Sequence, residues 1–203
     1  AIIAAVFAVA VILRWTSVPE YEITDLGYIK RAGYAAAINN KGQVVGSSEL
    51  TNGQGHAFIW HQDSGMVDLC KPGDPTSGAC SINNAGRVVG YSFEKYRPRA
   101  FIWGPSKGIT KLKVPGNQNF AASINDSGQI VGVHRTDKWL IFGKLVSIFL
   151  WDSERGTTDL DALLNQKGAD IVAVDINDKG QIVVTLRQSQ QNQVLLLTPK
   201  AGP

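Results

Sequence analysis

The hydrophobic pattern of this chain repeats four times. Each repeat has a polar turn with a central glycine, a short apolar segment, a loop and then an aromatic-rich apolar segment. The turns with their following apolar residues occupy positions 37–46, 81–90, 123–132 and 175–184. The equivalent isoleucines are Ile38, Ile82, Ile124 and Ile176, and they are 42 to 52 residues apart. This spacing is typical of propeller blades and too long for simple helical solenoids.

The elements within each repeat predict a four-stranded antiparallel meander. Asn and Asp in the polar turn favour a tight hairpin, and the glycine accepts the left-handed conformation that completes it. These structural turn glycines are Gly42, Gly86, Gly128 and Gly180. The aromatic-rich segments are 56–60, 99–103, 147–151 and, in degraded form, 194–197. Such continuous apolar runs suit a strand that is covered on both faces.

The closing element of each repeat suggests how the array ends. Short fourth strands are expected at 66–69, 109–112 and 157–160, but the last repeat lacks one. The Ile-Thr-Asp-Leu segment at 23–26 copies the missing strand, and adding it to the final blade would close the ring and remove exposed edges. The sequence therefore predicts an all-β domain over residues 21–199, a small four-bladed β-propeller of four-stranded antiparallel repeats.

An unbroken apolar segment precedes this domain and ends at Arg14 and Trp15. We interpret residues 1–15 as an N-terminal transmembrane helix that anchors the protein, with an interfacial tryptophan. The anchor residues are Ala1, Ile2, Ile3, Val6, Phe7, Val11, Ile12, Leu13 and Trp15. Thirteen apolar residues are too few to span a bilayer, so we expect the run to continue upstream. The alternatives are a signal peptide with a cleavage site at residues 8–10, and a buried core helix.

Two cysteines, Cys70 and Cys80, bracket a stretch of turn-forming residues. A disulfide between them would stabilise the fold by about 2 to 3 kcal/mol and would persist only in an oxidising compartment. The alternative, a metal-binding pair, lacks further Cys or paired His residues at ligand spacing. We therefore predict a disulfide, which agrees with export of the domain.

The repeat motif also resembles a known family. The turn Ile-Asn-Asn/Asp-x-Gly-Gln-Val-Val-Gly, followed by His-Ala-Phe-Ile-Trp at 56–60, resembles the bacterial HAF repeat over about residues 21–199. Arg99 replaces the histidine in the second repeat, and the last two repeats depart further, which argues that His56 is not a required ligand. The resemblance implies an exported extracellular repeat protein with no common enzymatic activity.

Candidate chemistry is sparse along the chain. His56 and His61 lie at opposite ends of one expected strand, five positions apart and so on opposite faces, and His134 is expected in a loop. The segment 175–180 is similar to part of a calcium loop but lacks the closing Glu, and we interpret it as a hairpin turn. A net charge of +3 without a basic stripe argues against nucleic acid. We predict no catalytic residue, no metal site and no cofactor.

The third repeat carries an enlarged loop over residues 134–145 with an apolar centre. Its central residues are Trp139, Leu140, Ile141 and Phe142, and lysines flank them. Such a cluster is costly to leave in water and predicts docking to a partner or to lipid headgroups. The alternative is that the insertion folds back as an extra strand pair over the domain.

These features leave three hypotheses for the function. The first is a non-catalytic, membrane-anchored accessory subunit that caps an integral membrane protein complex, with its domain periplasmic or extracellular. The second is a secreted or surface module that binds a glycan or protein at the end of the ring. The third is a small hydrolase, which would need clustered acidic or His side chains with perturbed protonation. We favour them in that order.

Overall fold

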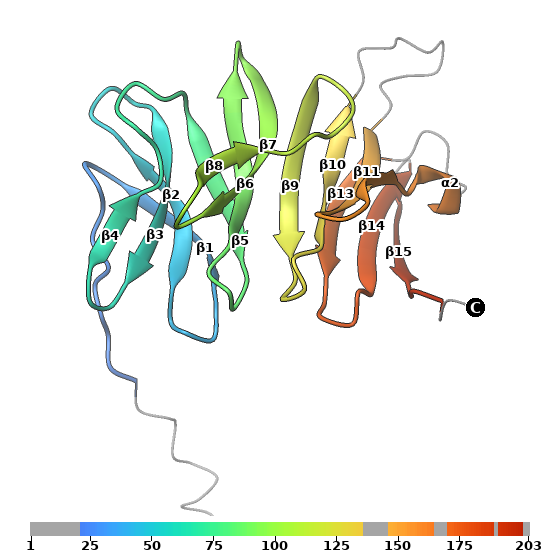
Figure 1. Cartoon of the computed structure of the whole chain (residues 1–203), viewed down its shortest axis with the longest axis horizontal. Helices are drawn as coiled ribbons and strands as arrows, with labels where there is room; N and C mark the ends of the chain where they lie inside the picture. The colour runs from blue at the N-terminus through green and yellow to red at the C-terminus, as the bar shows by residue number, and fades with distance from the viewer. Residues whose placement is uncertain (1–20, 136–145, 165–169, 189–190, 201–203) are drawn as a thin grey trace, which may run out of the picture.

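Four antiparallel β-sheets lie in a row, in chain order, in the computed structural model (Figure 1). The structure describes residues 21–135, 146–164, 170–188 and 191–200. The first sheet contains β1 (Gly33–Ile38), β2 (Val44–Glu49), β3 (Gly55–His61) and β4 (Gly65–Asp68). The second contains β5 (Ser77–Ile82), β6 (Val88–Glu94), β7 (Arg97–Gly104) and β8 (Gly108–Lys111). The third contains β9 (Gln118–Ile124), β10 (Ile130–Arg135), β11 (Val146–Asp152) and β12 (Gly156–Asp159), followed by the short helix α2 (Asp161–Leu164). The fourth contains β13 (Asp170–Ile176), β14 (Ile182–Gln188) and β15 (Gln191–Leu197).

The predicted meander is confirmed in the first three repeats. Strands pair in chain order within each sheet, and every pair is antiparallel. The turn glycines also behave as predicted, because each has a positive φ between 71° and 84°. The arrangement is therefore an all-β, propeller-like array of meander sheets.

The predicted closure of the ring is wrong for the part of the chain that the structure describes. Residues 23–26 form no strand, Ile23 is exposed, and the fourth sheet has three strands. The Asp25 carboxylate accepts the Gly27 N–H at 2.9 Å, which turns the chain directly after this segment. Farther on, the Ile29 N–H donates to Ser48 Oγ at 3.0 Å. These contacts hold the segment beside the first sheet, at the opposite end of the row from the fourth.

A β-bulge in the first strand of each sheet explains the glycine that ends the Val-Val-Gly motif. Opposite Gly46, Gly90 and Gly132 the register of the first strand shifts by one residue. The bulge brings a backbone carbonyl against the glycine, so that a Cβ on Gly132 would lie 2.0 Å from the Phe120 oxygen. The fourth repeat has Val184 at this position, and there its bulge lies farther back, between Ile171 and Ala173. The bulge thus moves where valine replaces the glycine.

The hydrophobic core consists of three clusters, one between each pair of neighbouring sheets. The second and third strands of one sheet supply one side of each cluster, and the first three strands of the next supply the other. In the first cluster, for example, Val45 and Ile59 pack against Ile82 and Phe101. Both faces of the second and third sheets therefore carry buried apolar residues, as the sequence pattern predicted.

A ladder of hydrogen bonds connects the four turns across the sheets. In each of the first three turns, the first Asn donates through Nδ2 to the backbone carbonyl of its counterpart in the next sheet, at 3.0 Å in all three cases. The second residue of the turn donates its N–H to the side-chain oxygen of its counterpart at 2.8 to 2.9 Å. The donors of these two rows are Asn39, Asn83 and Asn125, and Asn40, Asn84 and Asp126. The repeat motif therefore encodes the contact between sheets as well as the hairpin.

The predicted membrane anchor, residues 1–15, lies outside the described residues. Among the helices that the structure does describe, none has the length and hydrophobicity of a membrane span. The anchor therefore stays a prediction from the sequence.

Candidate functional site

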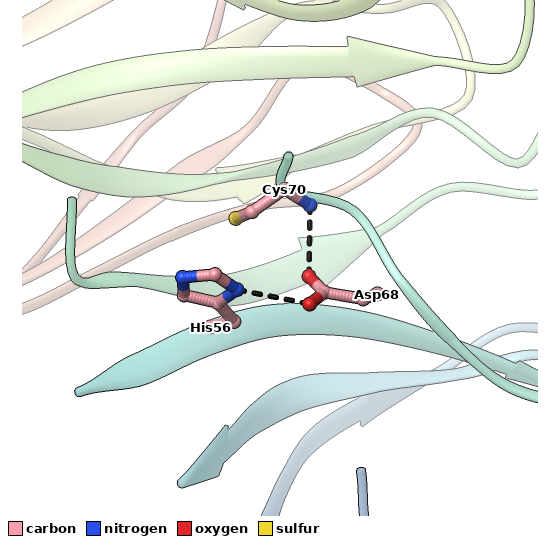
Figure 2. Close-up of side chains that lie close together, drawn as sticks. All are labelled: His56, Asp68 and Cys70. Atoms are coloured by element: carbon pink, nitrogen blue, oxygen red, sulfur yellow. Dashed lines mark hydrogen bonds and ion pairs between the residues drawn. The ribbon is translucent and has the colours of Figure 1, made fainter. Parts of the chain in front are cut away.

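The group of side chains with the most chemistry is formed by His56, Asp68 and Cys70 in the first sheet (Figure 2). His56 lies near the start of β3, Asp68 ends β4, and Cys70 follows two residues later. Because β3 and β4 are antiparallel, with Phe58 opposite Asp68, the start of one strand meets the end of the other. The meander therefore brings together residues that are 12 to 14 positions apart.

Hydrogen bonds fix the orientation of the buried His56 ring. Its Nδ1 contacts the Asp68 carboxylate at 2.9 Å, and its Nε2 contacts the Asp74 backbone carbonyl at 3.4 Å. The second carboxylate oxygen of Asp68 accepts the Cys70 N–H at 2.9 Å. Both partners of the imidazole are oxygen acceptors, so a ring with a single N–H can donate to only one of them at a time. Asp68 therefore orients both the ring and the backbone that carries the thiol.

The Cys70 thiol is held by a serine from the next sheet. Its Sγ lies 2.9 Å from Ser77 Oγ, which also accepts the Ala57 N–H at 3.0 Å. Burial raises the pKa of the Cys70 thiol, although the bond with Ser77 opposes this effect. A raised pKa keeps the sulfur protonated at neutral pH, whereas a catalytic cysteine needs the thiolate. The group therefore differs from an activated Cys-His pair.

The predicted disulfide is absent, since Cys70 and Cys80 are both free thiols in the structure. The sequence argument treated the intervening residues as one turn-rich loop. In the structure β5 already begins at Ser77, and Cys80 falls at the bulge of this strand between Ala79 and Ser81. Burial raises the pKa of the Cys80 thiol to about 11. The end of the segment between the two cysteines is therefore held by strand pairing in β5. The sequence had suggested that a disulfide would hold it.

The same group has a donor set suited to a metal ion. One ligand atom each from His56, Asp68 and Cys70 lies within 4.8 Å of the others. Imidazole, carboxylate and thiolate together are ligands that zinc accepts. Sequence reasoning missed this group because it looked for ligands at short spacing. The Asp-Leu-Cys segment after the closing strand was the available signal, since the meander returns that strand to the histidine.

A related pair occurs in the third sheet, where His134 Nε2 lies 3.4 Å from an Asp159 carboxylate oxygen. The sequence placed His134 in a loop, but it lies in β10 and is buried. It faces Ser147 across the strand pair, whereas in the first sheet Ser48 faces His56. The two sheets thus exchange His and Ser between neighbouring strands while both keep an aspartate. The contact recurs at the same aspartate position in two of the four sheets, which indicates a structural role, although the buried His134 nitrogens make no hydrogen bond within the described residues.

The second sheet replaces this pair with an ion-pair network. Arg99 and Lys111 take the positions of His56 and Asp68, and both approach Glu94, at 4.0 and 3.0 Å. The hydrogen bond from Lys111 lowers the pKa of the Glu94 carboxyl. The position is therefore polar in each four-stranded sheet, and only the first sheet adds a thiol.

The predicted partner-binding residues Trp139, Leu140, Ile141 and Phe142 lie outside the described residues. The loop that contains them joins β10 to β11 in the third sheet. Their role in docking stays a prediction.

One of three comparisons with known proteins bears on the fold. No protein-family model matches the sequence, and a search of curated proteins gives no match. Among solved structures, the chain is similar to TolB from Acinetobacter baumannii, with a TM-score of 0.63 and 13% sequence identity. The match covers 82% of this chain and 40% of the TolB chain. At this identity the likeness concerns the fold, and it supports a β-propeller-like arrangement of the four sheets.

Proposed function

We propose that this protein is a non-catalytic binding or scaffold domain, exported and held at a membrane, that serves as an accessory subunit of an integral membrane complex. The observation that carries the proposal is that its reactive side chains make structural contacts. The buried His56 and His134 both pair with aspartates at equivalent positions, and the thiol of Cys70 has a raised pKa. What remains for function is the surface of the array of sheets.

The finer parts of the proposal rest on the sequence. The apolar residues 1–13 support membrane attachment, and the apolar centre of the 139–142 loop supports docking to a partner. The resemblance to HAF repeats supports export. A secreted module that binds a glycan or protein is the rival proposal, and it differs in requiring neither the anchor nor the membrane complex.

Mild detergent extraction of native membranes, followed by native separation and mass spectrometry, tests this function. We expect the chain to migrate with an integral membrane complex and to retain peptides from residues 1–13. The double substitution Trp139→Ser and Phe142→Ser should release it from the complex. Tyr96→Ser, at an exposed position in the β6–β7 turn, is the control and should leave migration unchanged. A free monomer that begins after residue 10 would instead favour the secreted module.

Zinc binding is a second candidate, favoured by the geometry of His56, Asp68 and Cys70. Cobalt(II) is a suitable probe because a thiolate ligand gives an intense charge-transfer absorption near the ultraviolet. A Cys70→Ser variant should lose this absorption, and Cys80→Ser should keep it. If the wild-type chain gives no such band, or if Cys80→Ser also removes it, the zinc proposal fails.

A further inference from the structure

The two ends of the sheet array carry the two halves of the contact that joins its internal sheets. We call the face of a sheet that packs against the next sheet in the chain its outgoing face. The face that packs against the preceding sheet is its incoming face. Among the described residues, which form the row in Figure 1, no sheet follows the outgoing face of the fourth sheet and none precedes the incoming face of the first. The residues on these two faces can be compared with their buried counterparts.

The incoming face of the first sheet is uncovered at its central isoleucine. Ile38 is 67% exposed, whereas the equivalent Ile82, Ile124 and Ile176 are 7%, 5% and 7% exposed. The sequence at this position is the same in all four repeats. In the described residues a sheet precedes each of the three buried isoleucines and none precedes Ile38, which therefore has the side chain of an interface residue without the interface.

The outgoing face of the fourth sheet is uncovered in the same way. Val183 is 39% exposed, although its equivalents Val45, Val89 and Val131 are fully buried. Leu196 pairs with Val183 across β14 and β15 and is 65% exposed, while its counterpart Ile59 is 2% exposed. The fourth sheet thus keeps an apolar face that the earlier sheets bury against a neighbour.

The hydrogen-bond ladder is also open at both ends, and the ends are complementary. Asn177 Nδ2 bonds to Gln181 within its own turn, but in the described residues it has no counterpart ahead to accept its second N–H. The same holds for the N–H of Asp178. At the other end, the Asn39 carbonyl and Asn40 Oδ1 occupy the positions that accept these bonds in the later sheets. Donors therefore remain at the fourth sheet and acceptors at the first.

We propose that the outgoing face of the fourth sheet binds the incoming face of the first sheet in a second copy of this chain. Val183 and Leu196 pack against Ile38 of the other copy, and Asn177 donates to its Asn39 carbonyl. A second copy is the partner because an interface of this kind needs the repeat motif on both sides. Two copies joined at both ends form a closed ring of eight sheets, and closed propellers contain four to eight blades. Closure also buries the exposed apolar faces, and such faces are liable to aggregate if left open.

The mass of the full chain, released from detergent micelles in native mass spectrometry over a concentration series, tests this proposal. We expect the wild type to have twice the mass of one chain. Ile38→Asp and Val183→Asp place a charge in the contact and should each raise the dissociation constant by about 100-fold or more. Tyr96→Asp adds the same charge at an exposed turn far from both faces and should leave the pair intact.

Rescue by opposite charges separates loss of the contact from loss of folding. The double variant Ile38→Lys with Val183→Asp should recover the pair, because each copy then presents a cation to an anion. Circular dichroism should give the same β-sheet spectrum for all variants. A wild type that stays at the mass of one chain at every concentration, or a Val183→Asp variant that still pairs, overturns the proposal. Masses that grow without limit would overturn the closed pair, since they indicate an open filament.

Discussion

The third and fourth sheets share a sequence motif but differ in how closely their strands approach. In the third sheet, Gly132 allows the Phe120 carbonyl to lie against the second strand, and a bulge forms there. In the fourth sheet, Val184 occupies this position and pairs directly with Val174. In the part of the chain that the structure describes, the third sheet has neighbours on both sides and the fourth on one. The comparison teaches that a bulge at this position needs the glycine, whereas burial of a sheet face needs a neighbouring sheet, and these two requirements can be tested separately.

The largest effect is expected when the glycine of the third sheet receives a side chain. In Gly132→Ala the new Cβ would lie 2.0 Å from the Phe120 oxygen and 2.6 Å from Phe149 Cζ. Both the backbone and a buried ring would have to move, so we expect the free energy of unfolding to fall by about 3 kcal/mol. Urea denaturation measures the loss.

A second glycine gives the matched control for this substitution. A Cβ on Gly104, in β7, meets nothing within 4 Å. Gly104→Ala should therefore change the free energy of unfolding by less than about 0.5 kcal/mol. Equal losses in the two variants would show that the close approach at Gly132 does not limit stability.

A smaller effect should separate the first turn from the last one. Asn39 caps its own turn by accepting the Lys41 and Gln43 N–H groups and by donating to Gln43 Oε1, and it also donates to the Asn83 carbonyl of the next sheet. Asn177 makes the same three contacts within its turn, with Lys179 and Gln181, but lacks the bond to a following sheet in the described residues. Asn39→Ala should therefore cost about 1 kcal/mol more than Asn177→Ala, which is the contribution of the bond between sheets. Similar urea midpoints for both variants would argue that the ladder adds nothing to stability.

The contrast between buried and exposed surface should also appear in the reactivity of the two thiols. Burial raises the pKa of Cys80 to about 11 and also raises that of Cys70, so both are protonated at neutral pH. Alkylation by iodoacetamide requires the thiolate. The rate at Cys80 should therefore keep rising with pH up to about pH 11, as followed by peptide mass spectrometry. A reductant should leave the melting temperature unchanged, and a clear drop would mean that a disulfide joins the two cysteines after all.

The smallest effect concerns acid, at the step of the ladder between the second and third sheets. The backbone N–H and Nδ2 of Asn84 donate to the Asp126 carboxylate and lower its pKa. A carboxyl whose pKa is lowered on folding stabilises the fold above its unfolded pKa, and this contribution disappears as the pH falls through the folded pKa, below about 4. Asp126→Asn should flatten this part of the pH dependence of the urea midpoint. An unchanged acid limb in that variant would assign the effect to other carboxyls.

The repeated pattern determined much of the fold by itself. The spacing of the isoleucines and the Asn-x-x-Gly turns predicted strands, hairpins and meander sheets. These features could be predicted because the pattern of apolar residues along a strand and the left-handed conformation of a turn glycine depend on residues close in sequence. The residues of the ladder were visible as a motif, but its contacts were not. A hydrogen bond from Asn39 to Asn83 joins residues 44 positions apart, and only the stacking of sheets brings them together.

The tertiary structure alone decided the remaining features. It left residues 23–26 out of the fourth sheet, because the Asp25–Gly27 turn and the hydrogen bond from Ile29 to Ser48, 19 residues away, hold the chain beside the first sheet. It kept Cys70 and Cys80 apart by placing the second in a paired strand, and it brought Cys70 to His56 and Asp68. It also gave identical isoleucines opposite environments, buried inside the row and exposed at Ile38. A sequence motif specifies which contacts a repeat can make, but whether they form depends on which neighbour the fold supplies.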